Sequence, residues 1–369
     1  MSQETPLSDN RARNIHVRLV NAVSAIAPQD WDRLANPDPD RFDPFVNWRF
    51  LNALEVSDSV GDGTGWHPHH LIAETAGQIQ AIMPLYLKTH SQGEYVFDHG
   101  WADALHNAGG QYYPKLQAAI PFTPVTGRRF LVGANTPEQA PAEALIEALS
   151  AAAVKLAASH DLSSLHLTFL AEDQWNTLKK LGFLGRTDQQ FHWYDRGYGN
   201  FEGFLASLAS RKRKDLRKER AAAQQGLTIR RLTGEDIRPE HWDAFWDFYQ
   251  DTGARKWGSP YLTRAFFDQI HAAMRQDVLL VLALDGTTPI AGALNFIGGE
   301  ALYGRYWGRH PMAEDRPFLH FEVCYYQAID FAFEKGLIRV EAGAQGAHKV
   351  ARGYEPALTR SAHWIAHPG

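Results

Sequence analysis

The feature that most constrains the fold of this chain is a ten-residue spacing that occurs twice. Gly182-Phe183 is followed ten residues later by His192-Trp193, and Gly353-Tyr354 is followed at the same spacing by His363-Trp364. In both places a predicted strand and a predicted helix come before the first dipeptide, and the second dipeptide closes its half of the chain. Matched spacing and matched order of elements indicate an internal duplication. We therefore expect two copies of one αβ unit, joined near residues 197–201.

The length of the chain agrees with two units. A chain of 369 residues is longer than one hydrophobic core usually serves, and 44% apolar with 21% charged residues is the composition of a globular protein. We expect a disordered N-terminal tail over residues 1–13, an N-terminal domain over 14–197 and a C-terminal domain over 198–369. The expected fold class is α+β, with a mixed β-sheet flanked by helices in each domain.

Hydrophobic periodicity predicts the elements of each domain. In the N-terminal domain these are strand 14–20, helices 28–34 and 46–56, a hairpin with its turn at Ala76-Gly77, strand 93–99, helix 137–160, strand 164–170, helix 172–181 and strand 190–195. In the C-terminal domain these are helices 237–252 and 261–274, a hairpin of 278–285 and 289–298, strand 301–308, helix 318–335, strand 338–343, a helical turn at 348–352 and strand 360–366. Residues 101–127 are rich in aromatic residues, glycine and proline and show no clear period.

A basic segment opens the second half. Residues 210–220 read SRKRKDLRKER and carry seven basic and two acidic side chains. Ser210 is the expected N-cap, and Gly226 the expected stop, of a helix over 210–225. Four consecutive cations in the first turn oppose the helix dipole by about 0.3–1 kcal/mol each, and a bound phosphate would relieve this. The alternative is a solvated helix face with internal ion pairs.

Charge and composition argue against several classes of protein. The net charge is −5 although the basic segment contributes +5, so the rest of the chain is acidic and we expect no DNA partner. Cys324 is the only cysteine, and His67, His69 and His70 lack an acidic partner at helical spacing, so we expect no metal site. The sequence has no run of 18 apolar residues and no apolar segment within its first thirty residues. We therefore expect a cytoplasmic protein without membrane insertion.

Five segments carry a resemblance to a known family. The order hairpin, strand, long helix, strand, short helix and closing strand is that of the GNAT acyltransferase fold. Two such units with a basic helix opening the second resemble the FemAB-like branch of that superfamily, whose members are described as predicted N-acyltransferases or peptidoglycan biosynthesis/recognition proteins. The segments that carry the resemblance are 97–127, 210–220, 303–308, 317–330 and 341–365. The resemblance implies tandem GNAT-like domains and transfer of an acyl or aminoacyl group to an amine acceptor.

The sequence departs from the GNAT pattern where the acyl donor binds. GNAT enzymes that use acetyl-CoA have a Gln/Arg-x-x-Gly-x-Gly/Ala loop before the long helix, whereas residues 309–320 read RHPMAEDRPFLH. The basic helix is therefore our candidate for the donor's phosphates, through Arg213, Lys214, Arg217 and Arg220. FemAB-type enzymes take the acyl group from aminoacyl-tRNA, but no tRNA-docking helical insertion is recognisable. The donor stays open between acyl-CoA and aminoacyl-tRNA, and we expect no tightly bound cofactor.

Transfer to an amine needs a base for the amine's proton, donors for the carbonyl oxygen and accurate placement. Glu322 lies in an apolar helical segment, where burial would raise its pKa toward that of a base; the alternative is a structural ion pair with Arg305 or Arg352. His320 and His348 have suitable ordinary pKa values, although each could equally be a packed histidine.

A second group of residues is expected to recognise the acceptor, a small-molecule or peptide amine that would enter between the halves. The expected substrate-binding residues are Asp98, His99, Trp101, Tyr112 and Tyr113 in the first half and Arg305, Tyr306, Gln345 and Lys349 in the second. For the first-half group the alternative is an ordered loop that packs against the second domain. Two rival functions remain open: a tRNA-dependent transferase acting on a peptidoglycan precursor or small peptide, and a non-catalytic binder of cell-wall precursors.

Overall fold

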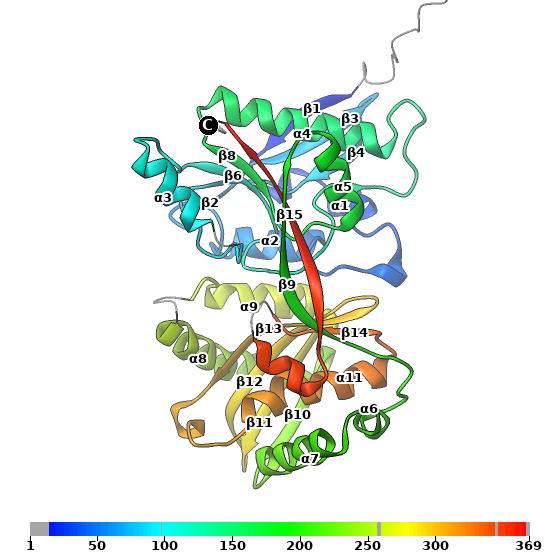
Figure 1. Cartoon of the computed structure of the whole chain (residues 1–369), viewed down its shortest axis with the longest axis vertical. Helices are drawn as coiled ribbons and strands as arrows, with labels where there is room; N and C mark the ends of the chain where they lie inside the picture. Colours follow the sequence, from blue (N-terminus) through cyan, green and yellow to red (C-terminus); the bar gives the residue numbers. More distant parts are fainter. Residues whose placement is uncertain (1–14, 97, 257–259, 344–345, 367–369) are drawn as a thin grey trace, which may run out of the picture.

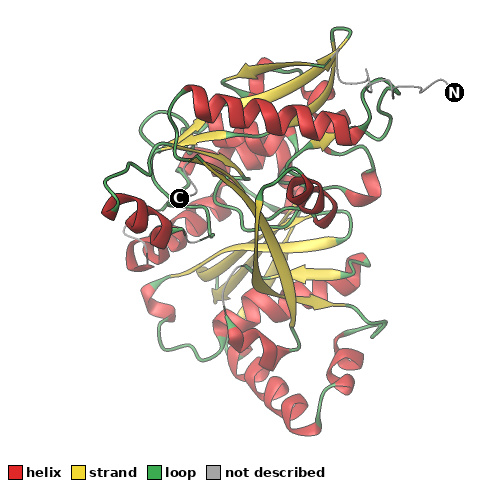
Figure 2. Cartoon of the chain, turned by 45° about the horizontal axis from the view of Figure 1, so that its top comes forward, coloured by secondary structure: helices red, strands yellow, loops and turns green. Residues whose placement is uncertain are grey.

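The computed structural model describes residues 15–96, 98–256, 260–343 and 346–366 (Figure 1). The predicted tail over residues 1–13 lies outside these ranges. Among the described residues the strands form one four-stranded and one eleven-stranded sheet. Figures 1 and 2 show helices packed around the strands of both halves, and two long strands, β9 (Leu184–Tyr194) and β15 (Glu355–Ile365), running side by side through the middle of the molecule.

The bounds of the elements are as follows. The other strands are β1 (His16–Val20), β2 (Trp66–Pro68), β3 (His70–Thr75), β4 (Gln78–Met83), β5 (Tyr86–Lys88), β6 (Lys115–Ala118), β7 (Leu131–Val132), β8 (Ser164–Leu167), β10 (Thr228–Leu232), β11 (Val278–Asp285), β12 (Thr288–Ile297), β13 (Ala301–Arg309) and β14 (Arg339–Glu341). The α-helices are α1 (Pro28–Ala35), α2 (Trp48–Val56), α3 (His99–Asn107), α4 (Ala142–Ser159), α5 (Glu172–Lys180), α6 (Phe201–Ser207), α7 (Ser210–Gln224), α8 (Pro239–Lys256), α9 (Arg264–Met274), α10 (Leu319–Phe321) and α11 (Gln327–Lys335). Between α10 and α11 lies a π-helical turn, η7 (Glu322–Tyr326), and a 3₁₀ helix, η8 (Ala347–Arg352), precedes β15.

The hairpins form where the turn residues predict them. Ala76 and Gly77 both have positive φ, 49° and 75°, as a tight turn between β3 and β4 requires. Strand β11 reads VLLVLALD and is buried at every position except Asp285, which is the pattern of a central strand. Gly336 ends α11 in the left-handed region with φ of 67°.

The last strand of each half is paired with a strand of the other half. Strand β9 of the first half pairs with β14, where Glu341 lies opposite His192. Strand β15 of the second half pairs with β8, where His363 lies opposite His166. The two His-Trp dipeptides of the repeat therefore occupy matching places, and the eleven-stranded sheet is continuous from one half to the other. The boundary at residues 197–198 stays a prediction about folding units, since each half is completed by a strand of the other.

The prediction of a strand over 93–99 is wrong. Gly93 lies in a turn with φ of 80°, and α3 begins at His99. Glu94 and Asp98 within this segment are nevertheless buried, because they are the partners of lysines.

Two predicted helices begin or continue differently. Helix α4 begins at Ala142 rather than 137, since Pro141 takes the N-cap position in extended conformation. The helix predicted over 318–335 contains the π-helical turn Glu322–Tyr326. The basic helix α7 begins with Ser210 as its first residue; the N-cap is Ala209, without a side-chain cap, and Gly226 follows the C-cap with φ of 71°.

In the described ranges no helix has both the length and the apolar character that crossing a membrane requires.

Candidate functional site

A cavity of about 220 Å³ lies where the parallel strands β13 and β14 separate. The two strands pair only from Ala301↔Arg339 to Tyr303↔Glu341, after which β13 continues to Arg309. The cavity is lined by Tyr95, Tyr249, Thr252, Pro260, Tyr261, Ala293, Leu294, Asn295, Gly304, Arg305, Tyr306, Trp307, His320, Cys324, Tyr325 and Ala342. Beyond Tyr303 the edge of β13 that faces β14 has no paired strand in the described part of the chain, so its backbone groups are available to a ligand.

Asn295 brings a polar group into this apolar wall. The pairing of β12 with β13 shifts register between Leu294 and Asn295, and this irregularity directs the Asn295 side chain. Its Nδ2 atom donates to the carbonyl of Leu279 at 3.2 Å, whereas Oδ1 is buried and has no hydrogen-bond partner among the described residues. A Cβ atom at Gly304 would lie 3.2 Å from Oδ1, so glycine keeps the space beside this acceptor open. A buried acceptor without a partner is a place where a ligand N–H can bind.

Arg305 and Tyr306 join the cavity to the first half. The Nη2 atom of Arg305 and the hydroxyl of Tyr306 both donate to the carbonyl of Phe122, at 2.6 and 3.3 Å. Tyr95 supplies a further part of the wall from the first half. Of the nine predicted substrate-binding residues, Arg305 and Tyr306 line the cavity, and the acceptor's entry between the halves stays a prediction.

Of the three predicted catalytic residues, His320 lines the cavity directly. Its ring lies 5.0 Å from that of Trp307 and 5.3 Å from that of Tyr325. His348 does not line the cavity, but its Nε2 atom is 3.0 Å from the hydroxyl of Tyr325, which does. Desolvation, followed by the charges of Lys349 and Arg352, lowers the pKa of His348. His348 is therefore largely neutral at pH 7, and the tautomer that leaves Nε2 without a proton accepts from Tyr325.

Glu322, the third, faces away from the cavity. Its carboxylate is fully buried and accepts hydrogen bonds from Gln327 at 2.6 Å and Gln224 at 2.8 Å. Arg220 of α7 completes the arrangement at 3.3 Å. Burial raises the pKa of Glu322, and Arg220 partly opposes the shift. The contacts are those of the structural ion pair considered above, with Arg220 in place of Arg305 or Arg352.

Lys349 is buried beside the cavity rather than in its wall. Its Nζ atom donates to the carbonyl of Gly343 at 2.8 Å, and burial lowers its pKa to about 8. Gln345 lies outside the described residues.

The cations of the basic helix belong to two environments. Arg213, Lys214, Arg217 and Lys218 line an open surface hollow of their own, which shares no residue with the cavity. Arg220 instead points inward, where it pairs with Glu322 and Asp330.

A second hollow lies beside the start of the long helix and continues the cavity. It is lined by Thr252, Trp307, Arg309, Ala313, Glu314, Arg316, Phe318, Leu319, His320 and Phe321. Thr252, Trp307 and His320 line the cavity as well. Because these three residues line both, the hollow adjoins the cavity, and its own lining reaches Arg309 and Arg316.

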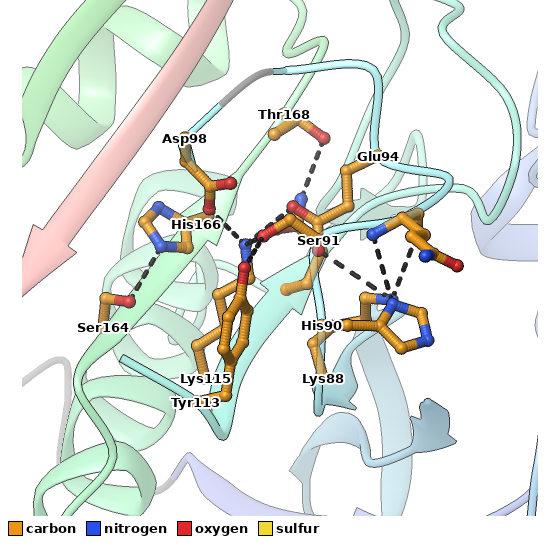
Figure 3. A network of polar contacts seen from close by, with 12 residues as sticks. Lys88, His90, Ser91, Glu94, Asp98, Tyr113, Lys115, Ser164, His166 and Thr168 are labelled. Atoms are coloured by element: carbon orange, nitrogen blue, oxygen red, sulfur yellow. Dashed lines mark hydrogen bonds and ion pairs between the residues drawn. The ribbon is translucent and has the colours of Figure 1, made fainter. Parts of the chain in front are cut away.

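Of the predicted first-half residues, Asp98, Tyr112 and Tyr113 lie close to Lys115, and Figure 3 shows Asp98 and Tyr113 beside it. Asp98 and Tyr112 are buried, Tyr113 and Trp101 are partly buried, and His99 is exposed as the first residue of α3. None of the five lines the cavity, and Asp98 and Tyr112 belong to a separate buried polar cluster around Lys115.

Several residues of the cavity and of the cluster around Lys115 were not predicted from the sequence. In the cavity these are above all Asn295 and Tyr325, and in the first half they are Lys88, Glu94 and Lys115. The available signal was a polar residue inside an apolar strand, such as Asn295 in ALNFI or Lys88 in PLYLK.

Known proteins resemble this chain in fold. No curated protein matches it in sequence. The crystal structure of FemX superposes with a TM-score of 0.56 at 15% identity, over 94% of this chain and 97% of FemX. The C-terminal domain of a protein from Agrobacterium fabrum described as a lysylphosphatidylglycerol synthetase gives 0.55 at 10% identity, over 91% of both chains. L-PGS from Bacillus licheniformis gives 0.52 at 9% identity, over 88% of this chain and 92% of L-PGS.

These likenesses and the strand order confirm the expected mixed α+β fold, which this chain shares with FemX over nearly its whole length. The family model of the FemAB-like proteins, described as peptidoglycan biosynthesis/recognition, matches residues 22–369. The expected relationship is thereby confirmed, and the chain belongs to the FemAB-like family.

Proposed function

We propose that the protein is an N-acyltransferase that moves an acyl or aminoacyl group from a phosphate-bearing donor to an amine acceptor. The observation that carries the proposal is the separation of β13 from β14 beside the unpartnered Oδ1 of Asn295 and the ring of His320. An acyl group placed there would meet unpaired backbone donors on one side and a base on the other.

The proposed reaction uses groups already in the cavity. The amine nitrogen attacks the donor's carbonyl carbon, a C–N bond forms, and the bond from that carbon to the leaving sulfur or oxygen breaks. Asn295 Oδ1 accepts an N–H of the amine and orients its lone pair, and His320 takes the proton that the amine loses. The hydroxyl of Tyr325, which is hydrogen-bonded to His348 at 3.0 Å, gives its proton to the leaving group. The proton that His320 took from the amine then replaces it by way of solvent, so the protein ends the reaction with the protons it began with. Backbone N–H groups along the free edge of β13 hold the oxyanion.

Two places can hold the donor's phosphates. The hollow at Arg309 and Arg316 continues the cavity and suits a compact donor such as acyl-CoA. The α7 hollow at Arg213, Lys214 and Arg217 shares no residue with the cavity and suits a donor large enough to contact both, such as an aminoacyl-tRNA. We retain both donors, with neither bound as a resident cofactor.

The family description supports a peptidoglycan precursor or small peptide as the acceptor. Aminoacyl-tRNA-dependent transfer to such a precursor is accordingly one form of the proposal. The second candidate function, binding of a cell-wall precursor without chemistry, is favoured by the word recognition in that description and by the placement of Glu322 away from the cavity. The cytoplasm is the compartment in which we expect these donors.

The test is a transfer assay with acetyl-CoA and with a mixture of charged tRNAs, using small peptide amines as acceptors and mass spectrometry of the products. His320→Gln and Tyr325→Phe should each lower turnover about 100-fold without changing the unfolding midpoint. The matched control is His310→Gln, an exposed histidine outside the cavity. Peptide binding with no acyl transfer from either donor would establish the non-catalytic alternative.

A further inference from the structure

Two lysines and two carboxylates are buried together in the first half (Figure 3). Lys88 and Lys115 lie opposite each other on β5 and β6, and Glu94 and Asp98 come from the segment between β5 and α3. The exposed fraction is 0% for both lysines, 3% for Glu94 and 4% for Asp98. Each buried ion costs several kcal/mol unless it is paired, so the four side chains have to be considered as one unit.

Asp98 is the member of this cluster that directly precedes helix α3. Its Oδ2 atom accepts hydrogen bonds from Lys115 Nζ and, at 2.7 Å, from the hydroxyl of Tyr112. Burial alone raises the pKa of Asp98, but the charge of Lys115 and the hydrogen bonds lower it below its ordinary value, so the group is a carboxylate. Its other oxygen, Oδ1, is buried without a hydrogen-bond partner among the described residues, as is Oε1 of Glu94.

Lys115 is the centre of the cluster. Its Nζ atom also donates to Glu94 at 2.7 Å and to the hydroxyl of Ser91 at 3.0 Å. Lys88 lies 3.9 Å from Glu94, and burial brings the pKa of both Lys88 and Glu94 to about 7. The net charge of the Lys88–Glu94 pair is zero both when the two side chains are ionised and when a proton has passed from Lys88 to Glu94. The charge on Lys115 is therefore balanced by Asp98.

Asp98 makes these contacts at the expense of its own helix. It is the N-cap residue of α3, yet its side chain accepts no hydrogen bond from that helix. An aspartate in this position ordinarily caps the helix and contributes about 1 kcal/mol. Helix α3 has nine residues, none of which is buried, and a helix of that length is marginal without packing. Asp98 holds the start of the helix, and Trp101 in its first turn packs with its ring 4.8 Å from that of His363.

We propose that Lys115 and Tyr112 form a binding site for the carboxylate of a ligand, that Asp98 occupies this site in the free protein, and that α3 is the cover the ligand displaces. Withdrawal of Asp98 leaves an excess positive charge at Lys115, which favours an anion. The site already holds a carboxylate in the geometry that Lys115 Nζ and Tyr112 Oη select. The withdrawn Asp98 is then free to cap α3, which offsets part of the cost of exposing the helix start.

The segment between β5 and α3 connects this site to the cavity. Tyr95 precedes Asp98 by three residues, lines the cavity, and has φ of 58°, a conformation that bulky residues rarely adopt. Movement of Asp98 is thus expected to shift the cavity wall at Tyr95. The inference rests on the proposed function only for the role of the ligand, which would be an amine acceptor that also carries a carboxylate, as a peptide does.

The site is tested by chemical rescue. Asp98→Ala removes the internal carboxylate and should lower the midpoint of thermal unfolding. Acetate should restore most of that loss, whereas acetamide and sodium chloride at equal ionic strength should not. Equal effects of acetate and acetamide would contradict a carboxylate site. If Asp98→Ala does not fold, hydrogen exchange on the wild-type protein tests the proposal without a variant at this position.

Displacement of the cover is tested on the wild-type protein by hydrogen exchange. N-acetyl-alanyl-alanine carries a carboxylate but no reactive amine, so it cannot be turned over, and its C-terminal amide is the matched control. At saturation the acid should raise amide exchange in α3 about tenfold, the amide should leave it unchanged, and Tyr112→Phe should reduce the response. Unchanged exchange with the bound acid, or equal responses to acid and amide, would overturn displacement. Neither measurement needs a donor, so loss of the proposed transfer activity would not affect the result.

Discussion

The Nε atom of Arg220 lies 3.3 Å from a carboxylate oxygen of Glu322 and so ties the basic helix α7 to the π-helical turn. A π-helical turn is a costly local conformation that usually marks a functional site or a packing constraint. Here the side chain of Glu322 turns toward α7, while Tyr325 of the same turn lines the cavity. One face of η7 therefore anchors α7 through Glu322, and the other face contributes Tyr325 to the cavity.

Glu322→Gln should therefore reduce stability and leave chemistry intact. The substitution removes a buried negative charge opposite Arg220, which keeps Asp330 as a second partner, and we expect a loss of about 1–3 kcal/mol. Urea denaturation measures the change. Glu334→Gln is the control, since it breaks the more exposed pair with Arg231 and should cost less than about 1 kcal/mol. Unchanged stability together with lost turnover would restore Glu322 as the base.

The outer cations of α7 should matter to a large donor only. Arg213→Gln combined with Arg217→Gln removes two positive charges from the surface hollow, together with the exposed ion pair of Arg217 with Glu202 and the hydrogen bond from Arg213 to the carbonyl of Ala206. We expect unfolding stability to stay the same or rise slightly, because cations in the first turns oppose the helix dipole. The affinity for tRNA should fall about tenfold, and the slope of log affinity against log salt concentration should become less steep by about one to two. The affinity for acyl-CoA should not change.

Fluorescence titration at two salt concentrations separates these outcomes. Arg238→Gln with Arg230→Gln offers a control of equal charge outside the hollow. A collapse of stability in the α7 variant would mean that the cluster is a structural ion-pair lattice.

Stability should depend on pH through Lys349. The folded protein holds this lysine with a pKa of about 8, below the ordinary 10.5, because it is buried. Between pH 8 and 10.5 the unfolded chain therefore binds the proton that the folded protein has released, and stability rises with pH in this window. The difference in unfolding free energy between wild type and Lys349→Met should thus increase by about 1–3 kcal/mol from pH 8 to pH 10. The exposed Lys335→Met should give a flat difference, and a flat difference for Lys349→Met would contradict the shift.

Much of the fold could be predicted because it is encoded locally. The apolar run of β11, the Asp285-Gly286 turn and the helix stop at Gly336 each act within a few residues. The exchange of β9 and β15 between the halves could not be predicted, because periodicity reports which face of a strand is buried and not which strand lies beside it. The error over 93–99 has a related origin, since a charged residue is read as exposed unless its partner, here Lys115, is known.

The candidate site was predictable where the resemblance supplied residues, as for Arg305, Tyr306 and His320. It was not predictable for Asn295, whose orientation depends on a register shift between two strands. Glu322 shows the reverse case, in which a polar residue in an apolar segment was noticed but its direction was not fixed by the sequence.

Asn295 should separate stability from activity more sharply than any other cavity residue. Its buried Oδ1 has no partner among the described residues, and a buried acceptor without a partner costs about 1–3 kcal/mol. Asn295→Leu keeps the branched shape of the side chain and removes that acceptor together with the hydrogen bonds from Nδ2 to the carbonyls of Leu279 and Ala293, so unfolding stability should change little. Turnover should fall about 10- to 100-fold, because the amine would lose the group that orients it. Equilibrium denaturation measures the change in stability, and the transfer assay on the same preparation measures the change in turnover. Asn295→Asp, which keeps an acceptor oxygen, should retain more activity than the leucine variant, and equal activities in the two would remove Asn295 from the proposed site.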